Sequence, residues 1–199
     1  MSLEQTVAFL VELDKLKTVV RKTKIAGGDH YENSAEHSWQ LALMALAMEP
    51  YAPEPVRIDR VVRMVLVHDV GEIDAGDVIV YAKVDPARRS AEELAGVERV
   101  FGLLPPEQAA PFIALWQEFE AARTPEARFA HALDRAMPVF LNLSNQGQSW
   151  RENNVPYEKV VRRIRPEIEA GCPALWQHLE SRLEAARRQG WFGQSLPGQ

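Results

Sequence analysis

Apolar residues recur at intervals of three and four along most of this chain, and prolines separate the resulting segments. This spacing places the apolar side chains on one face of an α-helix, whereas an exposed strand would alternate with a period of two. Proline is tolerated at the start of a helix because its missing N–H has no partner there. The pattern therefore predicts an all-α protein, with helices over residues 2–20, 35–49, 59–71, 86–101, 106–123, 125–143, 156–168 and 173–188.

Polar residues and glycines mark the expected helix ends. Ser34 and Asp59 stand where the second and third helices begin, and both residue types are favoured as N-caps. Gly71 is placed to end the third helix. The connections 21–33 and 72–85 are longer than packing requires, and long ordered loops often carry function.

The chain has 199 residues, enough for one domain with a hydrophobic core and too few for two ordinary ones. We expect one helical domain over residues 1–189 and a polar C-terminal tail over residues 190–199. The formal net charge of -5 argues against binding to nucleic acid or to an anionic membrane.

The chain also shows no signal for export or membrane insertion. No apolar run approaches the roughly 20 residues that cross a bilayer, and the N-terminus lacks the basic flank of a signal peptide. Cys172 is the single cysteine, so the chain cannot form an internal disulfide or a thiolate metal cluster. We therefore expect a cytoplasmic protein, in which any metal has nitrogen and oxygen ligands.

The most informative stretch runs from His68 to Asp77 and reads HDVGEIDAGD. Adjacent His68 and Asp69 at a helix end can reach one cation, although such a pair alone is more often a hydrogen-bonded helix cap. His37, at the start of the second helix, offers a further ligand. Asp134 lies in an apolar helical segment, where a buried carboxylate is costly without a cation. Together these residues indicate one divalent metal ion.

The order of a histidine, a histidine–aspartate pair and a distant aspartate resembles the H...HD...D signature of the HD-domain metal-dependent phosphohydrolases. The pattern H-D-x-x-E-x-x-x-G-D over 68–77 further resembles the YfbR-like 5'-deoxynucleotidases, which remove phosphate from deoxynucleoside monophosphates. Residues 16–21 are similar to the segment that bears this family's phosphate-binding arginine. The resemblance covers roughly residues 10–147 and implies a helical bundle of the HD-domain type that forms a homodimer.

Carried over residue by residue, the resemblance implies a role for each matching side chain. The implied metal ligands are His37, His68, Asp69 and Asp134. Glu72 would handle a proton, Asp77 would help to position that proton or the attacking water, and Arg21 would bind phosphate. We expect Mn or Co as the cofactor, with Fe, Ni, Zn or Mg as alternatives, because such a ligand set accepts all of them to different extents.

The sequence departs from this family beside the phosphate arginine. The family carries a tryptophan shortly after it that helps to define the sugar pocket, whereas this chain reads Arg21-Lys22-Thr23-Lys24. We therefore expect weak selection between deoxy and ribo sugars.

Other charged residues near these motifs have simpler interpretations. His131 is expected to support the site from behind or to be exposed. Arg88 and Arg89 follow the loop after Asp77 and could approach phosphate, but each precedes a glutamate, Glu92 or Glu93, by four residues. That spacing is typical of ion pairs on a helix surface, which we expect here.

These patterns predict an enzyme that hydrolyses nucleoside or deoxynucleoside 5'-monophosphates to nucleoside and phosphate. One alternative is an HD hydrolase of another phosphoester, such as a cyclic or modified nucleotide. Another is a non-catalytic, metal-containing nucleotide sensor. A sensor needs only the metal ligands, so the presence of Glu72 and Asp77 favours an enzyme.

Overall fold

The helical spacing of the sequence becomes helical structure over most of the chain. The computed structural model describes residues 2–78 and 85–194, and strands occur there only as one small hairpin. The all-α prediction is thereby confirmed. In chain order the helices and strands are α1 (Leu3–Leu13), β1 (Val20–Lys24), β2 (Tyr31–Asn33), α2 (Ser34–Met48), α3 (Ile58–Val67), α4 (Glu72–Ala75), α5 (Pro86–Phe101), α6 (Pro106–Ala121), α7 (Pro125–Ser144), α8 (Gln148–Glu152), α9 (Tyr157–Gly171) and α10 (Pro173–Arg188).

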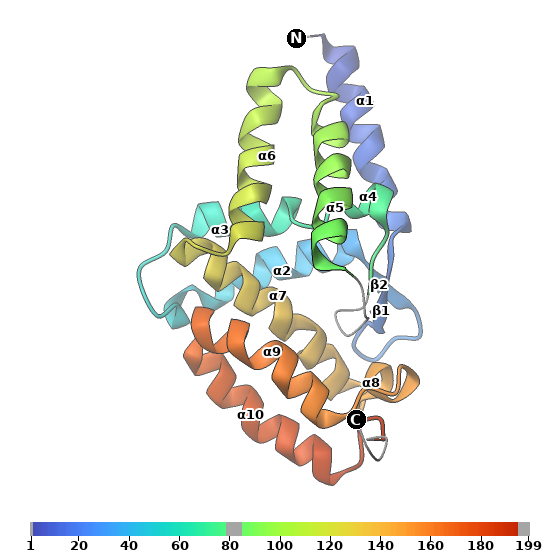
Figure 1. Ribbon diagram of the computed structural model, residues 1–199, viewed down its shortest axis with the longest axis vertical. Helices are drawn as coiled ribbons and strands as arrows, with labels where there is room; N and C mark the ends of the chain where they lie inside the picture. The colour runs from blue at the N-terminus through green and yellow to red at the C-terminus, as the bar shows by residue number, and fades with distance from the viewer. Residues whose placement is uncertain (1, 79–84, 195–199) are drawn as a thin grey trace.

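Helix α7 forms the centre of the bundle. Figure 1 shows it running through the middle of the molecule, with α9 and α10 below it and α1, α5 and α6 rising above. Its apolar residues Phe129 and Leu133 are fully buried, as are Met64 on α3 and Leu41 on α2. These helices therefore share one hydrophobic core, which surrounds the segments that carry the predicted site.

The first expected helix is shorter than predicted. It ends at Leu13, and the chain continues as a 3-10 segment over Asp14–Thr18 before it enters β1. Strand β1 then pairs antiparallel with β2, with Val20 opposite Asn33. Three consecutive β-branched residues ending at Val20 favour this extended conformation over a helix. The connection 21–33 is therefore a hairpin and not an irregular loop.

Two helix starts also differ from the prediction. Asn33, and not Ser34, caps α2, because its side chain accepts two backbone N–H groups of the first turn at 3.1 and 2.9 Å. Helix α3 begins at Ile58, so Asp59 lies inside its first turn and does not cap it. The five later helices from α5 to α10, the short α8 aside, follow the predicted ranges closely.

The predicted polar tail begins with a packed segment. Phe192 stacks on Trp150 with ring centroids 4.4 Å apart, and the Gly193 N–H donates to the Val155 carbonyl at 2.9 Å. Residues 195–199 of that tail, and residues 79–84 of the expected connection 72–85, lie outside the described residues. In the part of the chain that is described, no helix is both long and apolar enough to cross a membrane.

Candidate active site

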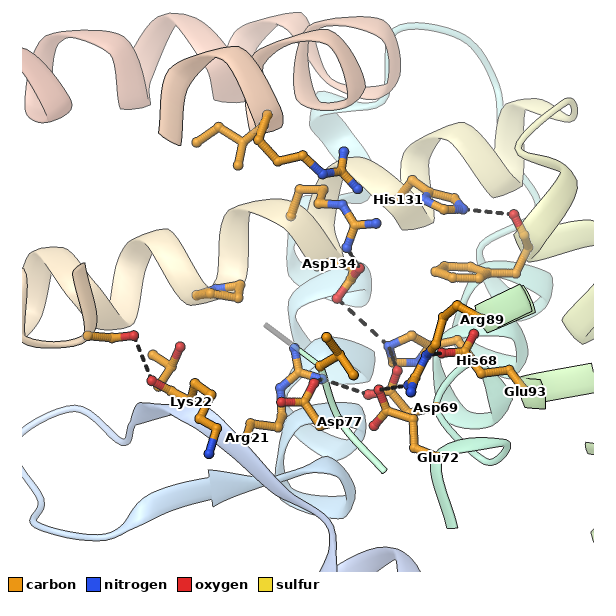
Figure 2. Close-up of a pocket in the computed structure, with 18 of the residues that line it drawn as sticks. Arg21, Lys22, His68, Asp69, Glu72, Asp77, Arg89, Glu93, His131 and Asp134 are labelled. Atoms are coloured by element: carbon orange, nitrogen blue, oxygen red, sulfur yellow. Dashed lines mark hydrogen bonds and ion pairs between the residues drawn. The ribbon is translucent and has the colours of Figure 1, made fainter. Parts of the chain in front are cut away.

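The four predicted metal ligands meet at the centre of the molecule, from three segments of the core. His37 lies in the first turn of α2. Asp134 lies on α7, and His68 and Asp69 directly follow the end of α3 (Figure 2). All four are buried. The structure thus brings together side chains that stand up to 97 residues apart in the chain.

The potential ligand atoms face one another. His37 Nε2 lies 3.0 Å from Asp134 Oδ1, and His68 Nε2 lies 3.0 Å from Asp69 Oδ1 and 3.8 Å from Asp134 Oδ1. One ligand atom from each of His37, His68 and Asp69 can be chosen so that all lie within 4.8 Å of one another. Atoms bound to one cation at about 2.0–2.2 Å have comparable separations.

The hydrogen bonds of His68 show that this cluster suits a cation. Its Nδ1 lies 2.8 Å from the Val65 carbonyl, which can only accept, so Nδ1 carries the proton and Nε2 of the neutral ring presents its lone pair. Among the described residues Nε2 is buried without a hydrogen-bond partner, yet carboxylates of Asp69 and Asp134 lie beside it. A lone pair that faces carboxylates is stabilised by a cation between them.

Electrostatic coupling within the cluster points the same way. Burial alone would lower the pKa of His68, but the carboxylates of Asp69 and Asp134 raise it well above its ordinary value. Burial alone would raise the pKa of Asp69, but His68 and Arg21 lower it to about 2. Both shifts show that positive charge is stabilised beside these two buried carboxylates.

Glu32 completes this region, and the sequence analysis missed it. Its side chain is 1% exposed, and Oε2 lies 3.3 Å from both Arg21 Nε and His37 Nδ1. A carboxylate behind an imidazole orients the ring and increases its basicity. The period of two along β2 turns Glu32 inward between two less buried neighbours, so recognition of the hairpin would have identified it.

Arg21 extends from β1 into the same pocket (Figure 2). Its Nη1 lies 3.0 Å from Asp69 Oδ2 and 3.9 Å from Asp77 Oδ1. Burial alone would lower the pKa of Arg21, but these and other carboxylates raise it, so the guanidinium stays charged. A fixed positive charge therefore stands beside the ligand cluster, where an anionic group could reach both.

Glu72 lies in the pocket, but on a different helix from the one predicted. We expected it to continue the third helix, but α3 ends at Val67 and a turn leads into the separate short helix α4, whose first residue is Glu72. The Ser34 hydroxyl, free because it does not cap α2, donates to Glu72 Oε2 at 2.7 Å. Burial, with the charge of Asp69, raises the pKa of Glu72 well above its ordinary value. Such a carboxylate binds a proton more readily than an exposed glutamate does.

Asp77, just beyond α4, lines the same pocket with its side chain 9% exposed. Burial raises the pKa of Asp77, although Arg21 opposes this shift. The pocket has a volume of about 580 Å³, a size typical of sites for small organic ligands. Lys22 and Thr23 from β1 also line it, whereas Lys24 lies over the ring of Tyr31.

The wall of the pocket holds further residues that the sequence did not identify. Arg89 forms the predicted pair with Glu93, but both side chains are mostly buried and line this pocket, so the pair does not lie on the helix surface. The prediction does describe Arg88, which is exposed and donates to Glu92 at 2.8 Å. The two arginines differ because successive helix positions are rotated by about 100°, and only Arg89 faces α4.

Behind Asp134, a polar network joins α7 to α9. Arg135 donates to Asp134 Oδ2 at 2.8 Å and to Glu167 Oε2 at 2.6 Å. His131, which we expected to support the site or to be exposed, is partly buried on the pocket wall. Its ring stacks on Phe119 with centroids 4.1 Å apart, and Nε2 bonds the Phe119 carbonyl at 2.8 Å.

Comparisons with known proteins agree with the resemblance to HD-domain phosphohydrolases. A model of the HD-domain family, described as "HD domain", matches residues 13–176. A solved structure from Magnetospirillum magnetotacticum MS-1, described as a predicted metal-dependent phosphohydrolase, is 43% identical in sequence with a TM-score of 0.89, over 96% of this chain and 98% of that one.

Several relatives carry the name 5'-deoxynucleotidase HDDC2, and two of them match most of the chain. The protein from Xenopus laevis is 31% identical over 76% of this chain and 76% of its own length. The protein from Dictyostelium discoideum is 28% identical over 87% of this chain and 94% of its own length.

Proposed function

This chain belongs to the HD-domain family of metal-dependent phosphohydrolases, and we propose that its substrates are nucleoside 5'-monophosphates, which it cleaves to nucleoside and phosphate. The observation that carries the proposal is the meeting, in one pocket, of the His/Asp cluster, Arg21 and a buried Glu72 with a raised pKa. The relatives named 5'-deoxynucleotidase support a nucleotide as the substrate class.

The metal would be held by His37, His68, Asp69 and Asp134. A divalent cation bound there would polarise a phosphoryl oxygen and make a bound water more acidic. Two imidazoles and two carboxylates suit Mn or Co, and they also accept Fe, Ni or Zn. Mg is less favoured because it prefers all-oxygen ligands.

Arg21 would bind the phosphate. Its guanidinium offers several donors in one plane, a geometry that matches phosphate oxygens. It stands 3.0 Å from Asp69, so a phosphate held beside the ligand cluster lies within its reach. This local positive charge allows a chain of net charge -5 to attract a dianion.

Glu72 would handle the proton of the attacking water. The Ser34 hydroxyl occupies Oε2, which leaves Oε1 toward the pocket wall near Arg89. When water attacks phosphorus and the bond to the 5' oxygen breaks, one water proton must leave the nucleophile and the leaving oxygen must gain one. Glu72 can take the first and return the second. Asp77, beside Arg21, would help to orient the reacting groups.

The test measures phosphate release from a panel of phosphoesters by metal-stripped protein, before and after addition of Mn or Co. We expect release from nucleoside 5'-monophosphates only in the presence of metal. Hydrolysis confined to cyclic or modified nucleotides would favour the alternative hypothesis, an HD hydrolase of another phosphoester. Nucleotide binding without turnover would favour a sensor. Light scattering on the same sample would test the predicted homodimer.

A further inference from the structure

We propose that Arg89 is a positioning residue, which holds the segment from Glu72 to Asp77 in its working geometry. The inference rests on the proposed function, in which Glu72 handles the proton. It assigns a task to a side chain that the proposed reaction does not otherwise use.

Helix α4 is too short to maintain its own geometry. It has four residues, fewer than an isolated helix needs to be stable, and it carries Glu72 at its start, with Asp77 just past its end. Gly76 closes it with a φ of +71°, a conformation that favours glycine. The carbonyls at the end of a helix have no partner within it, so other groups must bind them. The position of both carboxylates therefore depends on contacts from outside α4.

Arg89 on α5 supplies those contacts at the C-terminal end. Its Nη1 donates to the Ala75 carbonyl at 3.0 Å, and Nη2 donates to the Gly76 carbonyl at 2.5 Å. Its Nε donates to Glu93, one turn further along α5, which fixes the direction of the side chain. Figure 2 shows the guanidinium beside Glu72, whose Oε1 lies 3.8 Å from Nη2. One side chain thus binds the last turn of α4 and approaches the carboxylate of its first residue.

The start of α4 is held against the same helix by its backbone. A Cβ built on Gly71 would lie 2.5 Å from the Glu93 carbonyl oxygen, and one built on Gly96 would lie 2.6 Å from the Gly71 carbonyl oxygen. The two backbones are therefore in direct contact, and only glycine fits at either position. Helix α5 thus holds the segment at its start through the backbone and at its end through Arg89.

The contacts of Arg89 distinguish it from a phosphate-binding arginine. All three of its guanidinium nitrogens already donate to the protein, two of them to backbone carbonyls. In the part of the chain that the structure describes, the ion-pair partners of Arg21 are instead carboxylates of the pocket and of β2. We therefore assign substrate binding to Arg21, and to Arg89 the positioning of the segment from Glu72 to Asp77. Loss of Arg89 should reduce the rate of the chemical step more than the affinity for substrate.

The test compares R89A and R89K with two matched controls, using dAMP and metal-loaded protein. R88A removes the neighbouring, exposed arginine that pairs with Glu92. R99A removes the other tie from α5 to α4, an exposed pair in which Arg99 donates to Asp74 at 2.5 and 2.8 Å. R89K keeps the charge, but a single ammonium nitrogen cannot span two carbonyls and a carboxylate.

We expect kcat of R89A to fall about 10- to 100-fold with KM within about threefold of the wild-type value. R89K should lose a similar part of kcat, and R88A and R99A should stay within about twofold. A rise of KM with unchanged kcat in R89A would overturn the proposal and make Arg89 a substrate-binding residue. An equal loss of kcat in R99A would overturn it as well, because any loosening of α4 would then suffice.

Hydrogen exchange of the backbone amides of residues 71–77 gives a readout that does not depend on activity. We expect these amides to exchange at least about tenfold faster in R89A and R89K than in wild type, and R88A to match wild type. Unchanged exchange in both Arg89 variants would overturn the proposal. If wild-type protein hydrolyses no monophosphate, the proposed function fails, and the exchange data alone decide whether Arg89 positions the segment. R89K serves as the test variant should R89A fail to fold.

Discussion

The two sides of the pocket are built in different ways. On the metal side, His37, His68 and Asp134 belong to or directly follow long helices whose apolar faces form the core. On the acid side, Glu72 begins a four-residue helix and Asp77 follows it, and the Ser34 hydroxyl and Arg89 hold this segment in place. Many small packing contacts fix the side chains of the metal side, whereas a few polar contacts fix Glu72 and Asp77 on the acid side. Metal binding should therefore survive polar substitutions that abolish or slow turnover.

We expect the largest effect from removal of a proposed metal ligand. Asp69→Ala removes one of the proposed ligands, so we expect loss of the bound metal and a fall in activity of at least about a thousandfold. Metal analysis and the far-ultraviolet circular dichroism spectrum would measure retention and helix content. The helices should persist, because their packing does not depend on this carboxylate.

Asp74→Ala is the matched control for that variant. Asp74 lies on the outer side of α4 with its side chain 41% exposed, and it should keep both metal and most activity. Full metal content in Asp69→Ala would show that the proposed ligand set is wrong.

The next effect separates the two sides of the pocket. Glu72→Gln keeps the shape of the side chain and its bond from Ser34 but cannot exchange a proton, so kcat should fall about 10²- to 10⁴-fold. Metal content should stay at the wild-type level, because Glu72 is not a proposed ligand. Near-normal kcat with bound metal would remove Glu72 from the reaction.

These contrasts also explain what could be predicted from the sequence. The proposed ligands stand out because histidines and aspartates in apolar helical segments are costly unless a cation compensates them. Most helix ranges follow from spacing and from prolines at helix starts, and the structure bears them out. The acid side is harder, because α4 and its contacts depend on tertiary packing.

Arg88 and Arg89 illustrate this limit. Each precedes a glutamate by four residues, so the local pattern is the same for both. Only the contact between Gly71 and Gly96 decides which face of α5 lies on α4, and hence which arginine enters the pocket. Glu32 was missed for a related reason, since its burial appears only when β1 and β2 pair.

A smaller effect concerns stability on the metal side. Burial alone would raise the pKa of Glu167, but His131, Arg135 and Arg163 lower it to about 2 from its ordinary 4.5. A lowered pKa contributes stability that is present above about pH 4.5 and is lost as the pH falls toward 2. Glu167→Gln should therefore lower the free energy of unfolding by about 1–2 kcal/mol at pH 7.

Urea unfolding of metal-free protein at pH 7 and pH 3.5 would measure this effect, and the gap between Glu167→Gln and wild type should narrow at the lower pH. Glu169→Gln is the control, because Glu169 pairs with Arg165, one turn earlier on the same helix, and both side chains are 48% exposed. Its effect should stay below about 0.5 kcal/mol. A gap for Glu167→Gln that does not depend on pH would contradict the role of its charge.

The smallest expected difference concerns the sugar. Lys22 and Thr23 line the pocket beside Arg21. The 5'-deoxynucleotidase family that this sequence resembles carries a tryptophan in this neighbourhood. An apolar wall rejects an added hydroxyl by only about a hundredfold, so its loss should bring deoxy and ribo substrates close together. We expect kcat/KM for dAMP and AMP to differ by less than about tenfold, or about 1.4 kcal/mol. Arg21→Ala should weaken both substrates alike, because both carry the same phosphate.

Two polar residues at the α8 end of the pocket are already engaged with the protein. Asn142 accepts from the Ser149 N–H at 3.1 Å and donates to the Pro138 carbonyl at 2.9 Å. The Ser149 hydroxyl donates to the Lys22 carbonyl at 2.6 Å. Since these groups join α7, α8 and β1, we do not expect them to select between the sugars. A preference for dAMP of several hundredfold would show that other residues reject the 2'-hydroxyl and that the prediction is wrong, and a structure with bound nucleotide would identify them.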